Sequence, residues 1–147
     1  MGVKTSEIQV EKKEEDLYVT KITKEVADAI GSSKFKSGIA TIFIGCTTAS
    51  ISTMEYTPES IKHMREALER VAPSNANYLH NTSVGDINGY GADDNGKSHV
   101  RSAIMGPSIT IPFNDGKMML DNGLEVVLLD FDIIKRTRKV IIQVMGE

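Results

Sequence analysis

The fold is decided by the stretch Gly38-Ile-Ala-Thr-Ile-Phe-Ile44 and by the segment that follows it, Gly45-Cys-Thr-Thr-Ala-Ser-Ile-Ser-Thr-Met54. The first is a short, continuous apolar run rich in β-branched residues, which is typical of a buried strand. Ser50–Met54 predicts a second strand directly after it. A buried strand that opens into a run of hydroxyl side chains is also a usual place for a group that faces a ligand.

The C-terminal half predicts further strands. The polar loop in the middle of the chain is followed by strand-like segments, and two strong turn signals, Asn114-Asp-Gly116 and Asp121-Asn-Gly123, lie between the later ones. The expected strands are Val100–Met105, Ser108–Pro112, Val126–Phe131 and Lys139–Val144.

The N-terminal half combines an expected hairpin with helices. Val3–Val10 and Leu17–Thr20 carry strand-forming residues on either side of the charged residues 11–16, which predicts an N-terminal hairpin. A first helix is indicated by the helical spacing of Ile22, Val26, Ala29 and Ile30, and it closes at Gly31-Ser-Ser.

A second helix begins at Thr57-Pro58-Glu59, because it has a capping hydroxyl, a proline in the first turn and an acidic residue near the positive end of the helix dipole. Its expected buried stripe is Ile61, Met64, Leu68 and Val71. The sequence therefore predicts an α+β protein with many strands, two main helices and a long polar loop.

Length and composition bound the class of protein. The chain has 147 residues, of which 40% are hydrophobic and 25% charged, and its net charge is −3. These values fit one globular domain spanning residues 1–147, without broad binding to nucleic acid or to an anionic membrane. No apolar run approaches the roughly 20 residues of a membrane span. The single cysteine, Cys46, rules out an internal disulfide and is consistent with the cytoplasm.

Two of the three histidines, His80 and His99, bracket a loop crowded with glycines, amides and carboxylates. Such a loop is either an irregular connection with incidental histidines or a site where carboxylates and imidazoles converge on a ligand or cation. Neutral imidazoles beside a carboxylate hold borderline metals or move protons. The third histidine, His63, falls off the apolar stripe of its helix and is expected to face solvent.

Other candidate residues flank this loop in the expected fold. Arg101 follows His99 by two, so a strand would place both on one face. Glu55 ends the second strand and is expected to point towards the same end of the sheet. Cys46 is either a ligand-facing thiol or a small buried hydrophobe. The basic run Lys135–Lys139 is either a solvated turn balanced by nearby aspartates or an anion-binding rim.

Five motifs in order resemble the YjbQ-like family of small, mostly uncharacterised proteins. The motifs are Phe43-Ile-Gly-Cys-Thr-Thr-Ala49, Tyr78-Leu-His-Asn81, Asn95-Gly-Lys-Ser-His-Val-Arg-Ser-Ala103, Gly106-Pro-Ser-Ile-Thr-Ile-Pro112, and Phe131-Asp132 with Val144-Met-Gly-Glu147. The resemblance runs from about Gly38 to the C-terminus, and more loosely over the N-terminal segment.

This resemblance implies a compact α/β sandwich of mixed, largely antiparallel strands. It also implies a homotrimer with a histidine-bearing site near subunit boundaries. A weak thiamine-phosphate synthase activity is attributed to the family, so a small phosphorylated metabolite is the expected ligand.

The family pattern matches some site residues of this chain and differs at others. His80, His99 and Glu55 match family positions, whereas Cys46 and Lys97 stand where the family has histidines. The sequence also differs at Met54 and Tyr56, where the family has asparagines, and at Asp121-Asn-Gly-Leu124, where it has Gly-Thr-Trp-Gln.

The resemblance, together with these differences, leaves two functions open. In the first, the protein is a transferase of the thiamine-phosphate synthase type. In the second, it is a non-catalytic homotrimer that binds a metal or metabolite. The enzyme would use His80, His99 and Glu55 for catalysis and would bind its ligand through Thr47, Thr48, Asn95, Lys97 and Arg101. A divalent metal, Mg²⁺ or Zn²⁺, would be held by Cys46, His80, His99 and Asp93, with Asp86 and Asp94 as further carboxylates.

Overall fold

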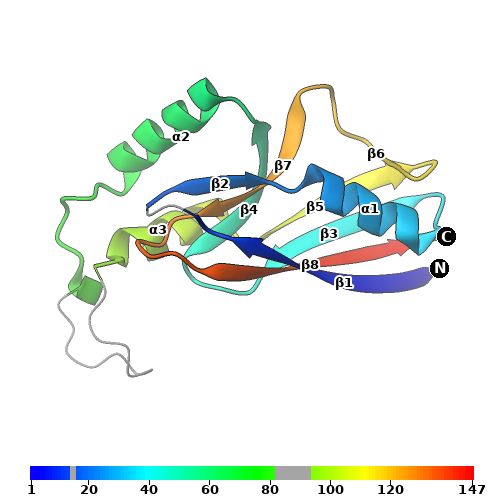
Figure 1. Ribbon diagram of the computed structural model, residues 1–147, viewed down its shortest axis with the longest axis horizontal. Coiled ribbons are helices and arrows are strands. Elements are labelled where there is room, and N and C mark those ends of the chain that lie inside the picture. The colour runs from blue at the N-terminus through cyan, green and yellow to red at the C-terminus, as the bar shows by residue number, and fades with distance from the viewer. Residues whose placement is uncertain (14–15, 82–93) are drawn as a thin grey trace.

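The computed structural model describes residues 1–13, 16–81 and 94–147, and within them two antiparallel sheets pack together with three α-helices (Figure 1). The larger sheet has the strand order β1-β8-β3-β5-β6, and the smaller has the order β2-β7-β4. The strands are β1 (Gly2–Glu11), β2 (Tyr18–Lys21), β3 (Gly38–Ile44), β4 (Ala49–Glu55), β5 (Ser108–Asn114), β6 (Lys117–Met118), β7 (Leu124–Asp130) and β8 (Thr137–Gly146). The helices are α1 (Thr23–Ser33), α2 (Pro58–Val71) and α3 (Gly96–Met105), with a short 3₁₀ turn η1 (Leu79–Asn81).

The smaller sheet is the middle layer, because β7 is buried on both faces. Val126 and Leu128 pack into the main core between the two sheets, which α1 closes with Val26 and Ile30. The alternate residues of β7 face a second, smaller core beneath α2, which contains Leu68. The continuous apolar run of β7 therefore follows from burial on both sides.

Local sequence signals are confirmed where they concern caps and tight turns. The Thr57 hydroxyl accepts a hydrogen bond from the Ser60 amide at 3.1 Å, which caps α2 as expected. Asp115 and Gly116 adopt φ values of 49° and 70°, as a two-residue hairpin turn between β5 and β6 requires. In the helix stripe Val71 was wrongly included, because it is 59% exposed and Ala72 takes the buried position after Leu68.

The expected N-terminal hairpin is wrong. β1 pairs with β8 in the larger sheet, from Gly2 opposite Gly146 to Glu11 opposite Thr137, while β2 pairs with β7 in the smaller sheet. The two segments thus enter different layers, because each finds its partner strand more than a hundred residues away along the chain.

The expected strand over Val100–Met105 is also wrong, and the chain has a third helix there. Residues 96–105 form α3, whose buried positions include Ser98, Arg101 and Ser102. The Ser50 hydroxyl donates to the Ser102 carbonyl at 3.1 Å, and the Ser102 hydroxyl donates to the Ala49 carbonyl at 2.8 Å. Polar contacts therefore fix α3 against β4.

The strand ends gather several candidate residues at one end of the sandwich. Ala49 at the start of β4 pairs with Asp130 at the end of β7, and Ile44 at the end of β3 pairs with Val140 near the start of β8. The loop 45–48, the end of β7 and the start of α3 consequently meet at this end, away from the two termini (Figure 1). None of the described helices is long and apolar enough to cross a membrane.

Candidate functional site

The two loop histidines lie against each other. His80 comes from η1 and His99 from the first turns of α3, and their ring centroids are 4.4 Å apart with the planes tilted by 41°. Gly96 makes this approach feasible, because a Cβ at this position would lie 2.4 Å from the Tyr78 Cβ. The Gly96 amide also donates to the Asn81 carboxamide oxygen at 2.8 Å. The structure thus brings His80 and His99 together, as the sequence-based hypothesis requires.

The environment of His99 favours its neutral form. Burial lowers the pKa of His99 below its ordinary value, and the neighbouring His80 lowers it further. The charge of Asp132 and a hydrogen bond to the backbone of Thr47 oppose this effect without overcoming it. At neutral pH His99 is therefore an uncharged imidazole whose unprotonated ring nitrogen can accept a proton.

The loop between β3 and β4 forms one side of the site. The backbone of Thr47 contacts His99, and Thr48 is buried with its hydroxyl donating to Asp132 Oδ2 at 3.0 Å. Cys46 is partly exposed and lies close enough to Arg138 to add to its electrostatic environment. The loop therefore joins the histidine pair to a set of buried charges.

These charges belong to a cluster of five side chains, Lys12, Asp130, Asp132, Arg136 and Arg138. All are buried except Arg136, which is exposed, and we call the set the buried charge cluster. Arg138 donates to both carboxylate oxygens of Asp130, at 2.6 and 2.9 Å. Lys12 Nζ lies 3.6 Å from Asp130 Oδ1, and Arg136 Nε donates to Asp132 Oδ2 at 2.6 Å. Lys12 Nζ also donates to the main-chain carbonyl of Asp132.

Burial and pairing act in opposite directions on the pKa values of the cluster. Burial lowers the pKa of Lys12, and the charges of Asp130 and Asp132 do not restore it. For Arg138, burial alone would lower the pKa, but Asp130, with smaller contributions from Cys46 and Asp132, raises it. Burial alone would raise the pKa of Asp132, yet Arg136 and Thr48 hold it below its ordinary value. The Arg138 guanidinium and the Asp132 carboxylate therefore remain charged at neutral pH.

Only part of this cluster was predictable from the sequence. Asp130 and Asp132 balance the basic run as expected, but Arg138 is 8% exposed and does not belong to a solvated turn. Lys12 was missed because it lies in a charged run. A usable signal was the alternation of β1, in which Ile8 and Val10 face inward and Lys12 continues the same parity.

The two cations expected to bind phosphate are engaged within the protein. Arg101 is 3% exposed, donates to the Ala72 carbonyl and pairs with Glu69 at 2.9 Å. Residues two positions apart on a helix point about 200° away from each other around its axis. Arg101 and His99 therefore do not share a face, as they would on a strand. Lys97 Nζ lies 3.0 Å from Asp16 Oδ1.

The remaining candidates divide between the site and the far end of the sheet. Asn95, at the start of α3, is buried, and its carboxamide oxygen has no hydrogen-bond partner among residues 1–13, 16–81 and 94–147. Glu55 ends β4, whereas Thr48 precedes its first residue, so roughly 20 Å of strand separates them. The expectation that Glu55 points to the same end is therefore wrong within one chain. Asp86 and Asp93 lie outside the described residues.

The donor set for a metal ion is incomplete in the part of the chain that the structure describes. His80 and His99 offer two imidazoles, but no three His, Cys, Asp or Glu side chains among the described residues are placed to share an ion. Two nitrogens alone do not make the three or four protein ligands of a zinc site. The described residues therefore fit proton chemistry by the imidazoles better than a metal centre, and the metal stays a prediction.

The sequence pattern of the UPF0047 YjbQ-like proteins matches residues 6–147. The chain belongs to the YjbQ-like UPF0047 family. A UPF0047 protein of Methanocaldococcus jannaschii is 31% identical over 142 residues, which cover 96% of this chain and 92% of that relative. A UPF0047 protein of Methanothermobacter thermautotrophicus is 28% identical over 126 residues, which cover 86% of this chain and 81% of that relative.

Solved structures of UPF0047 proteins share the fold. A YbjQ-like protein of unknown function from Sulfolobus solfataricus superposes with a TM-score of 0.89 at 21% identity, over 99% of both chains. An uncharacterised family member from Clostridium acetobutylicum gives 0.81 at 25% identity, over 95% of this chain and 99% of that one. These likenesses confirm the mixed α+β architecture with largely antiparallel strands.

The positions at which this UPF0047 chain was expected to differ from the family pattern lie in two places. Cys46 and Lys97 lie in the segments that carry the site, next to Thr47 and in the first turn of α3. Met54, Tyr56 and Asp121–Leu124 lie with Glu55 at the other end of β4, since Glu55 pairs with Leu124.

Proposed function

We propose that this UPF0047 protein is an enzyme that uses the His80–His99 pair for proton transfer on a small phosphorylated metabolite. One observation carries the proposal: two imidazoles lie 4.4 Å apart, and one of them, His99, has a lowered pKa and feels the charge of the buried Asp132. General acid–base groups need a proton affinity near the working pH and a fixed orientation. The contact of His99 with Thr47 and the charge of Asp132 supply that orientation.

The specific reaction that we propose is of the thiamine-phosphate synthase type. A thiazole nitrogen forms a bond to the methylene carbon of a pyrimidine pyrophosphate, and the bond from that carbon to oxygen breaks. Pyrophosphate leaves with the electron pair. A neutral His99 has a single N–H, which the backbone of Thr47 engages, so its other ring nitrogen can accept a hydrogen bond from a donor group of the substrate. The Asn95 carboxamide oxygen, which has no partner among the described residues, can accept a second.

We also propose that the site binds a divalent cation, Mg²⁺ or Zn²⁺, and this part of the proposal is tested separately. When bound, such an ion would neutralise charge on the leaving phosphates. The described residues supply only part of a ligand set, so we assign no step to it. Metal analysis of the purified protein tests whether His80 and His99, with Cys46, Asp93 or both, retain a stoichiometric ion.

One observation favours the alternative, a non-catalytic protein that binds a metabolite or metal. Arg101 and Lys97 are already paired with Glu69 and Asp16, so neither is available to neutralise a phosphate without breaking an existing contact. A binding protein needs less charge neutralisation than a transferase, because no new negative charge develops in it.

We also propose that the protein is a cytoplasmic homotrimer. The outer face of the larger sheet supports self-association, because Val3, Met145, Ile39 and Pro112 form one exposed row across four strands. Exposed apolar rows of this kind mark association surfaces. Light scattering that gave a monomer mass at every dilution would contradict the trimer.

The enzyme proposal is tested by assaying thiamine phosphate formation from the two phosphorylated substrates. Replacing His80 or His99 by glutamine should reduce turnover by about 10²-fold or more. The matched control is His63→Gln, since His63 is an exposed histidine of α2. Retained binding of the pyrimidine pyrophosphate without any turnover in the wild type would favour the binding protein instead.

A further inference from the structure

The edge of the larger sheet formed by β1 has no partner strand among the described residues. β1 is ten residues long and pairs only with β8. The Lys12 amide donates to the Arg136 carbonyl at 2.8 Å, so the even-numbered residues of β1 direct their backbone groups to β8. Since hydrogen-bonded and non-hydrogen-bonded pairs alternate, the backbone groups of the odd-numbered residues 3–11 point to the open edge.

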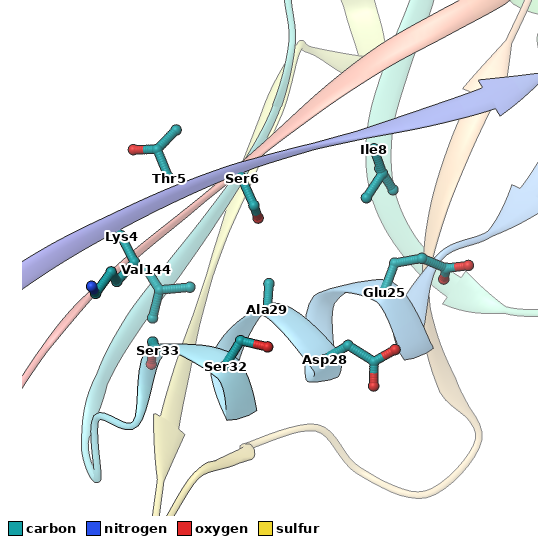
Figure 2. Close-up of a pocket in the computed structure, with 10 residues that line it drawn as sticks. All are labelled: Lys4, Thr5, Ser6, Ile8, Glu25, Asp28, Ala29, Ser32, Ser33 and Val144. Atoms are coloured by element: carbon teal, nitrogen blue, oxygen red, sulfur yellow. The ribbon is translucent and has the colours of Figure 1, made fainter.

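A groove runs beside this edge. One hollow of about 410 Å³ lies between β1 and α1, and a second of about 310 Å³ continues from it towards β2. Both are lined by Ile8 and Glu25, so they adjoin along the strand. Figure 2 shows Ile8 and Ser6 pointing towards α1, and Thr5 pointing away from it.

The groove is apolar at its floor and carries carboxylates on its helix wall. Ile8, Ala29 and Val144 supply the apolar surface, while Glu25 and Asp28 rise from α1 (Figure 2). On the β1 side, Lys4 lines the first hollow, and Lys13 and Glu11 line the second. Asp28 pairs with Lys24 at 2.6 Å, whereas Glu25 lines both hollows. At the β2 end, the buried Thr20 hydroxyl oxygen has no hydrogen-bond partner in the part of the chain that the structure describes.

We propose that this edge and groove bind an extended segment of another protein as an added strand, with a lysine or arginine facing Glu25 and apolar residues two positions to either side. Strand addition of this kind takes affinity from main-chain hydrogen bonds and specificity from alternate side chains. The backbone groups on the open edge of β1 supply the hydrogen bonds, and the apolar floor with Glu25 supplies the specificity. This site lies on α1 and β1, apart from the histidine pair, so it does not depend on the proposed function.

The charges argue for a basic partner over a second copy of this chain. Antiparallel pairing of two β1 strands about a two-fold axis would place both α1 helices on the same side of the joined sheet. Glu25 and Asp28 of the two copies would then approach each other, and like charges facing across strands are destabilising. A segment with a central cation would instead neutralise Glu25.

The test uses the full chain and two labelled peptides, Thr-Val-Thr-Lys-Thr-Val-Thr and the same peptide with glutamate in place of lysine, measured by fluorescence anisotropy. The lysine peptide should bind about tenfold more tightly, and Glu25→Lys should reverse the preference. Thr5→Pro removes an amide from the open edge without touching the pairing with β8, so it should weaken both peptides about tenfold. Thr5→Val keeps that amide and should bind like the wild type.

Three outcomes would overturn the proposal. The first is no binding of the lysine peptide up to about 1 mM. The second is binding that is insensitive to both Thr5→Pro and Glu25→Lys. The third is a fall in the mass of the unliganded protein by light scattering in Thr5→Pro but not in Thr5→Val, which would show that a second copy occupies the edge.

Discussion

Replacing Asp130 by asparagine should destabilise the protein strongly, because it leaves buried positive charge without its main partner. Asp130 is 1% exposed and accepts two hydrogen bonds from Arg138, and Lys12 Nζ lies 3.6 Å from Asp130 Oδ1. The buried charge cluster holds three cations and two carboxylates, so the variant retains a single carboxylate. Asparagine keeps the shape of the side chain, and the change is therefore mainly electrostatic.

Breaking a buried ion pair by removing one partner costs about 3–5 kcal/mol. For a chain of this length, each kcal/mol lowers the melting temperature by roughly 2–4 °C, so Asp130→Asn should melt roughly 6–20 °C earlier. Urea unfolding monitored by circular dichroism at one protein concentration gives the free energy of unfolding. The slope of that free energy against urea concentration should stay unchanged. The matched control is Asp28→Asn, which removes an exposed ion pair with Lys24 and should change little.

A double-mutant cycle with Arg138→Gln separates the pair from its surroundings. Residues in direct contact show coupling of about 0.5–3 kcal/mol, so the double variant should be more stable than the sum of the two single losses predicts. A loss below about 1 kcal/mol for Asp130→Asn, the net value of an ordinary hydrogen bond, would refute the reasoning. It would mean that water reaches the cluster and screens its charges.

Three further predictions concern the site. The pKa of His99 is lower in the folded protein than in the unfolded chain, so the unfolded state binds a proton first as the pH falls. The contribution of His99 to stability should therefore be complete above about pH 6.5 and decrease below it. His99→Gln should reduce this decrease in urea titrations between about pH 5 and 7. A fall of equal size in that variant would contradict the assignment. Gly96→Ala should separate η1 from α3 and reduce turnover. Its control is Gly31→Ala, where the added methyl group has no described atom within 4 Å; this variant should keep its turnover and gain roughly 0.5–1 kcal/mol in free energy of unfolding. Equal turnover in the two variants would show that the close approach is dispensable. Arg101→Met should lower the melting temperature while leaving phosphate binding in calorimetry unchanged, and lost binding in a stable variant would restore its predicted ligand role.

Features that depend on neighbours in the sequence were predictable. The cap of α2 depends on Thr57 and Pro58, and the hairpin turn depends on Asp115 and Gly116, so a few adjacent residues contain all the information needed. The N-terminal hairpin failed for the converse reason. Adjacent strands predict a hairpin unless distant partners compete, and β8 supplies a partner of equal length for β1.

The error at α3 has a specific physical cause. Its buried face is polar: Ser98, Arg101 and Ser102 recur at helical spacing, but their hydrogen bonds and ion pair replace the apolar contacts that hydrophobic periodicity detects. The pairing of His80 with His99 was expected, but a separation of 19 residues in the sequence does not determine how close two side chains lie. The structure shows the close approach and shows that Gly96 makes room for it.

The position of β8 between β1 and β3 has a consequence for synthesis on the ribosome. Neither β1 nor β3 can acquire this shared neighbour until residues 137–146 have been translated, although both were made long before. Sheets that depend on such distant contacts assemble slowly and expose unpaired strands to aggregation in the interim. The nascent chain therefore carries an unfinished larger sheet until β8 emerges, and chaperones that recognise exposed apolar strands would have most of the translation time to act on it.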